Sequence, residues 1–306
     1  SYRDRFTTEE YAQVVQWGVL GTASLQEGTR HKLRVNFLLN REWEDEVKRI
    51  VGQREQDGDT SLVFELGTAE QTLRNVQLEG DHRVSRDGMR LTWAAALTGA
   101  RRYEPDQRLS KYLRMYPTDT LFNPDFPWFV AATGGLQDRY WFDLQENGWG
   151  GRTDLEIPVE WSLLQDGSRV RTGAFFFSKN RDYDVRRLSY IAGPGIQNGP
   201  EKFGGRYEDY FGAFDGTADS GYVTNRNQEQ KDSYEVSDLQ SALHAQVDMK
   251  LGEAWRLITG ARLVFASVDG FSRSAQGRLS PPEAAVAQCV AGECKVPFGY
   301  DQVALL

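Results

Sequence analysis

Three acidic residues on one expected strand come nearest, in this chain, to a catalytic arrangement. Asp154, Glu156 and Glu160 are at positions of equal parity, and residues of equal parity lie on one face of a strand. Neighbouring carboxylates can share general acid and base work. The next strand, however, carries Arg169 and Arg171 beside them. Acids beside arginines predict a cross-strand charge network on a polar face, and we do not expect a catalytic pair.

No other group of residues predicts an enzyme. The chain has no HExxH, GxSxG or Walker A motif. The glycine-containing run 193–199 misses the dinucleotide-binding spacing by one residue and predicts a loop. His31, His82 and His244 are far apart in sequence, and aspartates in Gly-containing segments do not follow EF-hand spacing. We therefore predict no catalytic residues, no cofactor and no metal site.

The two cysteines, Cys289 and Cys294, flank a short loop-like stretch. Their spacing is not CxxC and no histidine cluster accompanies them, which argues against zinc. A small loop closed by a disulfide would suit an oxidising compartment outside the cytoplasm. We expect a Cys289–Cys294 disulfide, with two free thiols as the alternative.

The elements that must position these residues are long strands with an apolar side and a polar side. Residues 31–43 are the clearest case: Leu33, Val35, Phe37 and Leu39 alternate with charged or amide side chains. Strands of soluble sandwiches usually stop after about 5–6 residues, whereas a strand tilted across a bilayer needs roughly 9–11. The length of these runs therefore favours a membrane barrel.

The connections between strands alternate between short and long. Short turns are expected near 26–28, 86–88, 165–168 and 252–253, and long loops at about 43–67, 104–136, 182–233 and 269–300. This alternation is typical of bacterial outer-membrane barrels, which have tight turns at one end and long loops at the other. The predicted fold is an all-β antiparallel transmembrane barrel, with eight to nine strands in this chain.

Alternate positions of these strands are expected to face a polar lumen. The side chains predicted to do so are Asn75, Gln77, Glu79, Asp154, Glu156, Glu160, Arg256 and Arg262.

The bulk composition agrees with a barrel. The 306 residues carry a formal charge of -8 and are 40% hydrophobic, with a mean hydropathy of -0.58. No stretch approaches 18 consecutive apolar residues, which excludes a transmembrane helix, but only alternate residues of a barrel strand contact lipid. The 12% aromatic content suits interfacial girdles. The negative charge argues against nucleic acid as a partner.

Two stretches resemble a known family. Residues 72–82 (TLRNVQLEGDH) followed by 91–106 (LTWAAALTGARRYEPD) resemble the barrel of TonB-dependent outer-membrane receptors, where an L-x-G-x-H-like run is commonly followed by L-x-W-x-x-x-x-S-x-A-x-R-x-E-P-D. Residues 154–158 and 175–187 are also similar to these barrels. The likeness extends over about 11–306, and 101–106 is its most specific part.

The resemblance implies a barrel of 22 strands closed by an N-terminal plug domain, of which this chain would be roughly two-fifths of the wall. No plug, TonB box or aromatic C-terminal residue is present, and the apolar ending 302–306 reads as the start of a strand. We thus expect a portion of a longer protein in the bacterial outer membrane, with membrane lipids and, through the absent plug, the periplasmic protein TonB as partners.

The implied function is uptake of an extracellular nutrient: a siderophore, a cobalamin-like ligand or an oligosaccharide. Aromatic residues of the loop 104–136 are the candidates for ligand contact, because aromatic rings stack on a sugar or siderophore ring; they could equally pack against another loop or a surface lipoprotein. These candidates are Tyr116, Phe122, Phe126, Trp128 and Phe129.

Two alternative functions fit the same pattern. A structural barrel could dock a surface, motility or secretion assembly or another large envelope complex through its long loops. A passive porin would need no plug. An enzyme has the least support.

Overall fold

The structure is a computed structural model that describes residues 5–53, 60–114, 129–130, 137–159, 167–192, 222–225, 233–251, 254–275, 287–290 and 293–305. All regular structure in these ranges is β-strand. Within them, no helix is long and apolar enough to cross a membrane.

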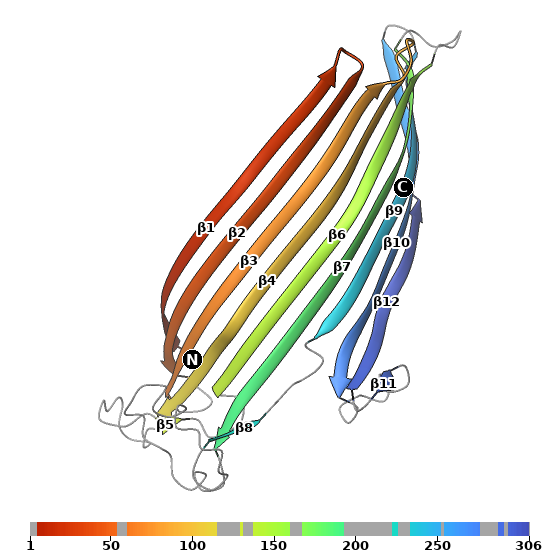
Figure 1. Cartoon of the computed structure of the whole chain (residues 1–306). Helices are drawn as coiled ribbons and strands as arrows, with labels where there is room; N and C mark the ends of the chain where they lie inside the picture. The colour runs from red at the N-terminus through yellow and green to blue at the C-terminus, as the bar shows by residue number, and fades with distance from the viewer. Residues whose placement is uncertain are drawn as a thin grey trace.

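The strands form one antiparallel sheet in which neighbours along the chain are neighbours in space (Figure 1). Nine described strands are long: β1 (Arg5–Glu27), β2 (His31–Gln53), β3 (Thr60–Arg83), β4 (Arg90–Arg114), β6 (Gln137–Pro158), β7 (Arg169–Ala192), β9 (Tyr234–Leu251), β10 (Trp255–Ala275) and β12 (Glu293–Leu305). Three are short: β5 (Phe129–Val130), β8 (Tyr222–Asn225) and β11 (Gln288–Val290). The order is β1-β2-β3-β4-β6-β7-β9-β10-β12-β11, with β5 on β4 and β8 on β7.

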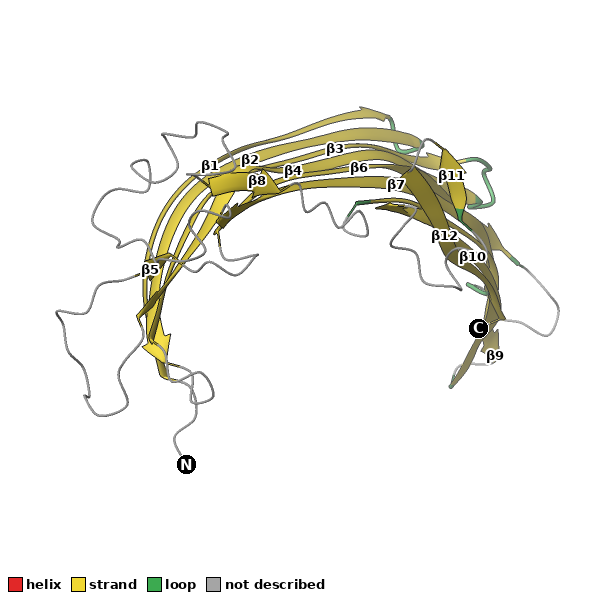
Figure 2. Ribbon diagram, turned by 90° about the horizontal axis from the view of Figure 1, so that it is seen from below, coloured by secondary structure: helices red, strands yellow, loops and turns green. Residues whose placement is uncertain are grey.

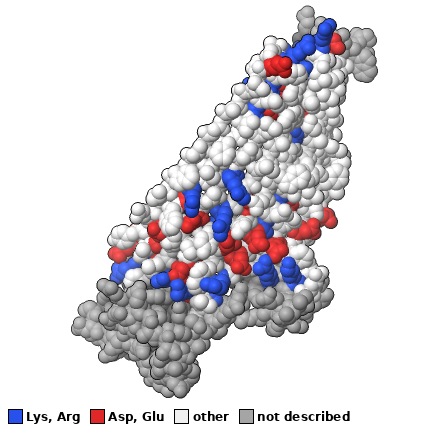
Figure 3. Space-filling model, in the orientation of Figure 1, with Lys and Arg blue, Asp and Glu red and all other residues white. Residues whose placement is uncertain are grey.

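The sheet bends into a wide open arc (Figure 2). Figures 1 and 3 look onto its convex side. The predicted fold class, an antiparallel all-β sheet curved like part of a barrel wall, is confirmed, while the total of 22 strands stays a prediction.

The two faces of the sheet differ sharply in chemistry. Because paired residues of adjacent strands share a face, the register traces each face from β1 to β12. On the convex face, large apolar side chains form a continuous zone, the apolar band, which corresponds to the mostly white region of Figure 3 between its charged upper tip and its charged lower part. Its exposed members include Val19, Leu25, Val35, Phe37, Val76, Leu78, Leu97, Leu239, Leu243, Leu257, Phe265 and Val303.

No second layer of described residues covers the apolar band. Leu25 is 70% exposed, Leu97 is 64% and Val303 is 65%. A soluble monomer rarely exposes so extended an apolar surface. On β2 the band runs from Leu33 to Leu39 and is bounded on the same face by His31 and Arg41, a span that matches the roughly 9–11 residues of a tilted transmembrane strand.

One end of the sheet carries short connections, and we call it the turn end; the other is the loop end (Figure 1). At the turn end, Gly28, Gly88 and Gly167 have φ values of +56°, +92° and +98°. Residues with a Cβ rarely adopt this region, which explains the glycines of the tight turns.

The strands continue into much of the sequence that we expected to be loop. Residues 43–53, 60–67, 104–114, 182–192, 269–275 and 293–300 are paired strand. Beyond the apolar band charged side chains also occur on the convex face, for example Asp45 and Arg49 on β2, so the alternation that marks a strand in the sequence weakens while backbone pairing goes on. β6 is described as far as Pro158, and residues 160–163, over which its alternation continues in the sequence, lie outside the described residues.

The two faces predict opposite responses to the same substitution at adjacent residues. Val76 is on the convex face and Gln77 on the other. We expect Val76→Arg to lower the free energy of unfolding in lipid bilayers by about 2–4 kcal/mol, as for arginine on the lipid face of a barrel, and Gln77→Arg to change it much less. Urea-induced unfolding of the two variants measures this, and equal losses would contradict the assignment of the faces.

Candidate functional site

The concave face carries a series of cross-strand ion pairs near the turn end. Glu156 on β6 accepts hydrogen bonds from two arginines of β7, at 2.5 Å from Arg169 Nη1 and 3.0 Å from Arg171 Nη2. Its side chain is 17% exposed, against 54% and 51% for the two arginines. The half-buried acid is therefore neutralised by two bases that are about half exposed.

The same alternation of charge continues across the sheet. Asp81 on β3 accepts two hydrogen bonds from Arg90 on β4, at 2.8 and 2.5 Å. Farther along, Asp248 on β9 pairs with Arg256 on β10. We call these contacts the charge row. Its ion pairs are Arg34–Glu79, Asp81–Arg90, Glu156–Arg169, Glu156–Arg171 and Asp248–Arg256, and it includes the contact of 3.1 Å between Asp154 Oδ1 and His244 Nε2.

The charge row explains several residues that we expected to line a lumen. Glu79, Glu156 and Arg256 each have an oppositely charged partner on a neighbouring strand. Asp154 instead contacts His244 on β9, two strands away. Glu79, Asp81, Glu156 and Asp248 thus each have a cross-strand arginine, an arrangement suited to a neutralised polar face.

Other predicted lumen residues share the concave face without entering the row. Asn75 and Gln77 follow the parity of Glu79 on β3, and Arg262 follows that of Arg256 on β10. Glu160 lies outside the described residues. Among the described ranges, no group of three or more His, Cys, Asp or Glu side chains could hold a metal ion.

The predicted ligand-contact residues are largely outside the structural description. Tyr116, Phe122, Phe126 and Trp128 lie in the undescribed range 115–128. Phe129 is in β5, opposite Leu113 of β4. Their role in ligand contact therefore stays a prediction.

A histidine pair at the turn end was not predicted from the sequence. His31 and His82 are directly opposite in the register of β2 and β3, with their Nδ1 atoms 3.1 Å apart. Trp93 Nε1 donates to His82 Nε2 at 3.0 Å. The two histidines are 51 positions apart in sequence, so only a hairpin register for β2 and β3 could have placed them together.

The most specific stretch of the family resemblance, 101–106, forms an irregularity of the sheet. The β4–β6 register shifts between Glu104 and Gln107, and Asp106 has a φ of +57°, which marks a β-bulge. Asp106 accepts hydrogen bonds from Arg108 Nη2 at 2.7 Å and from Arg139 Nε at 2.5 Å. This stretch therefore has an architectural role in the wall.

The charge of Asp106 is stabilised at this bulge, which lies toward the loop end and beyond the apolar band. Burial by itself raises the pKa of the Asp106 carboxyl, but the hydrogen bonds and charges of Arg139 and Arg108 outweigh it, so the pKa lies below its ordinary value of 3.8.

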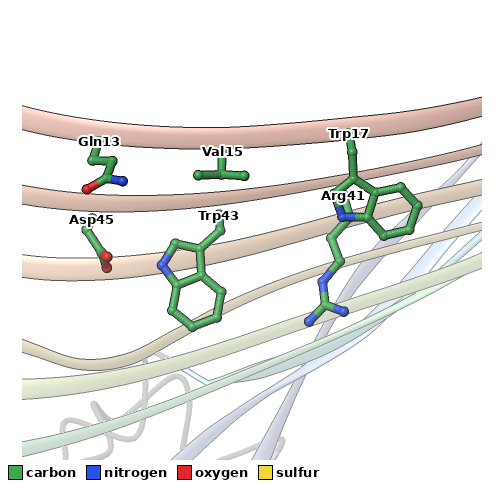
Figure 4. A pocket seen from close by; sticks show the side chains of 6 residues that line it. All are labelled: Gln13, Val15, Trp17, Arg41, Trp43 and Asp45. Atoms are coloured by element: carbon green, nitrogen blue, oxygen red, sulfur yellow. The ribbon is translucent and has the colours of Figure 1, made fainter.

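Aromatic residues mark the border of the apolar band on the side of the loop end. Trp17 on β1 and Trp43 on β2 are 47% and 42% exposed, and with Val15, Gln13, Arg41 and Asp45 they line a shallow hollow of about 410 Å³ (Figure 4). Exposed tryptophans beside an apolar zone are typical of the interfacial girdle of a membrane barrel.

The backbones of Cys289 in β11 and Cys294 in β12 are direct partners across the two strands. Antiparallel partners have Cα atoms about 4.5–5.5 Å apart, within the range that a disulfide requires. The register is thus compatible with the expected disulfide, which stays a prediction.

Comparisons with known proteins give one distant likeness to report. No family model matches the chain, and no curated protein matches it. Among solved structures, the closed form of the ferric-catecholate import receptor Fiu from E. coli K12 aligns with a TM-score of 0.41 and 11% sequence identity. The alignment covers 99% of this chain and 46% of the receptor chain, so this chain spans less than half of that receptor's length.

The bulge predicts a pH-dependent contribution to stability. Asparagine also tolerates positive φ, so Asp106→Asn removes the charge while keeping the turn. We expect it to lower the free energy of unfolding at pH 7 by about 1 kcal/mol, since the ion pairs are partly exposed.

Because the folded-state pKa is depressed, this contribution is present above the ordinary value of 3.8 and lost as the pH falls through the lower folded-state pKa. Denaturant unfolding of both proteins between pH 7 and pH 2 measures the effect. A difference that is absent at pH 7, or that grows on acidification, would contradict it.

The register of β11 and β12 is compatible with a Cys289–Cys294 disulfide, which would block alkylation of both cysteines. We expect neither Cys289 nor Cys294 to react with iodoacetamide in the denatured, unreduced protein, and both to react after reduction. Peptide mass mapping measures this, and alkylation of both residues before reduction would show two free thiols.

Proposed function

We propose that this chain is part of the wall of a bacterial outer-membrane β-barrel that takes up an extracellular nutrient by TonB-coupled transport. The observation that carries the proposal is the two-faced sheet: the same nine long strands present an uncovered apolar band on the convex side and the charge row on the concave side. The apolar band would contact lipid, and the concave face would line the lumen.

The hydrophobic effect supports placement in a bilayer. Burying apolar surface contributes roughly 25 cal/mol per Å², and within the described residues nothing from the chain itself buries the band. Lipid tails would cover it without any second protein layer. The matching of the span between His31 and Arg41 to a tilted transmembrane strand supports the same placement.

The gentle curvature supports a wide barrel. Nine long strands form only an open arc (Figure 2), whereas eight strands suffice to close a barrel whose interior side chains fill. A wider barrel has room for an aqueous channel or for a plug. Nutrient uptake, through either arrangement, requires such a lumen.

Two parts of the proposal, TonB coupling and a plug, are supported by the resemblance of residues 72–106 to the barrels of TonB-dependent receptors. The self-neutralised charge row is suited to a wall against which a polar plug would pack, because few of its carboxylates would be left without a cation when water is displaced. The nutrient would be recognised at the loop end and be a siderophore, a cobalamin-like compound or an oligosaccharide.

The test compares cells with and without the gene for this protein, each with and without an energy uncoupler. The probes are a panel of ⁵⁵Fe-labelled siderophores, labelled cobalamin and labelled oligosaccharides. We expect accumulation of one probe that requires both the gene and an energised inner membrane.

Two outcomes would favour the alternatives. Gene-dependent entry that persists in the uncoupled cells, for small solutes of many kinds, would support a passive porin. No gene-dependent uptake, together with a stoichiometric partner on purification from membranes, would support a docking role for the barrel.

A further inference from the structure

Three arginines converge on the convex face where the apolar band ends. Arg41 on β2 and Arg101 on β4 are both register partners of the same residue, Thr72 on β3. Arg74, two residues along β3, lies between them and the band. The three, which we call the arginine triad, line one hollow of about 420 Å³ with Glu70, Tyr103, Gln145 and Asn147 among its other walls.

The triad borders the apolar band directly. On the convex face Arg41 is followed toward the turn end by Leu39, and Arg74 by Val76. Figure 3 shows basic side chains gathered at the margin between the mostly white region and the charged lower part of the convex face. Trp17, the register partner of Arg41, is 47% exposed at the same border. A ligand held here would contact both the guanidinium groups and the apolar surface.

The triad keeps hydrogen-bond donors free for a ligand. Arg41 pairs with Glu70 at 3.0 Å through one nitrogen, and Arg101 forms two hydrogen bonds with Asp143, at 3.0 and 2.7 Å. A guanidinium has five N–H donors, so each retains others. Arg74 donates to the amide oxygen of Asn147 at 3.2 Å and has no carboxylate partner among the described residues.

A glycine holds Arg74 in place. The Arg74 side chain crosses its register partner Gly99 to reach Asn147 on β6. A Cβ on Gly99 would lie 2.4 Å from Arg74 Nε and 3.0 Å from its Cγ. The guanidinium of Arg74 can therefore extend across the sheet because position 99 has no side chain, and Gly99 determines its orientation.

We propose that the arginine triad binds the phosphate group of a lipid of the surrounding leaflet, with the acyl chains of that lipid on the apolar band. Arginine is suited to this because its planar fork binds phosphate through two parallel hydrogen bonds. Glu70 and Asp143 orient Arg41 and Arg101, and the triad with these two carboxylates keeps a net positive charge through Arg74.

This inference rests on the proposed function only for placing the convex face in a bilayer. It names a partner for the outer surface of the wall, whereas nutrient uptake uses the lumen and the loop end.

The test uses the full protein purified in detergent and titrated with lipid A carrying both phosphates, with the same lipid after phosphatase treatment, and with inorganic phosphate. Binding is read by native mass spectrometry. We expect Arg74→Gln to weaken binding of the phosphorylated lipid about tenfold, the effect of losing charge-assisted hydrogen bonds, and to leave the dephosphorylated lipid unaffected.

Two control variants make the test specific. Arg49→Gln removes an arginine of 46% exposure from the same convex face, on β2 and away from the hollow, and should leave binding unchanged. Gly99→Ala keeps every charge but displaces Arg74, and should weaken binding, whereas Gly21→Ala, where an added Cβ meets nothing within 4 Å, should not.

Equal binding of the two lipids, equal loss in Arg49→Gln, or competition by inorganic phosphate as strong as by lipid would overturn the proposal. Insertion of the protein into lipid vesicles, followed by urea and protease resistance, separates this failure from that of the proposed function. A protein that inserts but binds both lipids equally lacks only the phosphate site, whereas a protein that does not insert is not a membrane barrel.

Discussion

The backbone hydrogen-bond ladder is the constraint on which the rest of this structure depends. In a bilayer no water is available to an unpaired N–H or C=O, so strands must pair along their whole length in the membrane. The register is unbroken from β1 to β2 and from β2 to β3. Among the described strands it shifts only between β3 and β4 near Leu66 and between β4 and β6 near Glu104, toward the loop end. Irregular pairing among the described strands is thus confined to the loop end, beyond the apolar band.

The unbroken register converts a local alternation into two continuous surfaces. A slip of one residue in a single strand would transfer its apolar side chains to the concave face and its charges to the convex face. Charge pairs such as Asp81–Arg90 and Glu156–Arg171 oppose such a slip because they connect partners on neighbouring strands. Ion pairs this exposed contribute little stability each, so we assign them a role in register and in neutralising the wall.

How far the sequence predicts this structure depends on the surroundings of each segment. Residues 33–39 alternate clearly because one face is apolar and the other polar, and there the strand prediction is confirmed. Residues 43–53 are also strand but were assigned to a loop, since polar side chains on both faces leave no periodic signal. His31 and His82 were treated as unrelated because they are far apart in sequence. Their pairing depends on the register between β2 and β3, which the apolar alternation within each strand does not determine.

Asp106 suggests a structural reason for the resemblance to TonB-dependent receptors: it stabilises a bulge in the sheet. Residues 101–106 are the stretch that most resembles the family. In the structure their Asp106 stabilises a bulge and accepts hydrogen bonds from Arg108 and Arg139 of the sheet. A bulge increases local twist and bends the strand that carries it, and a wide barrel needs such bends to close. Motifs of this kind report how the wall is built.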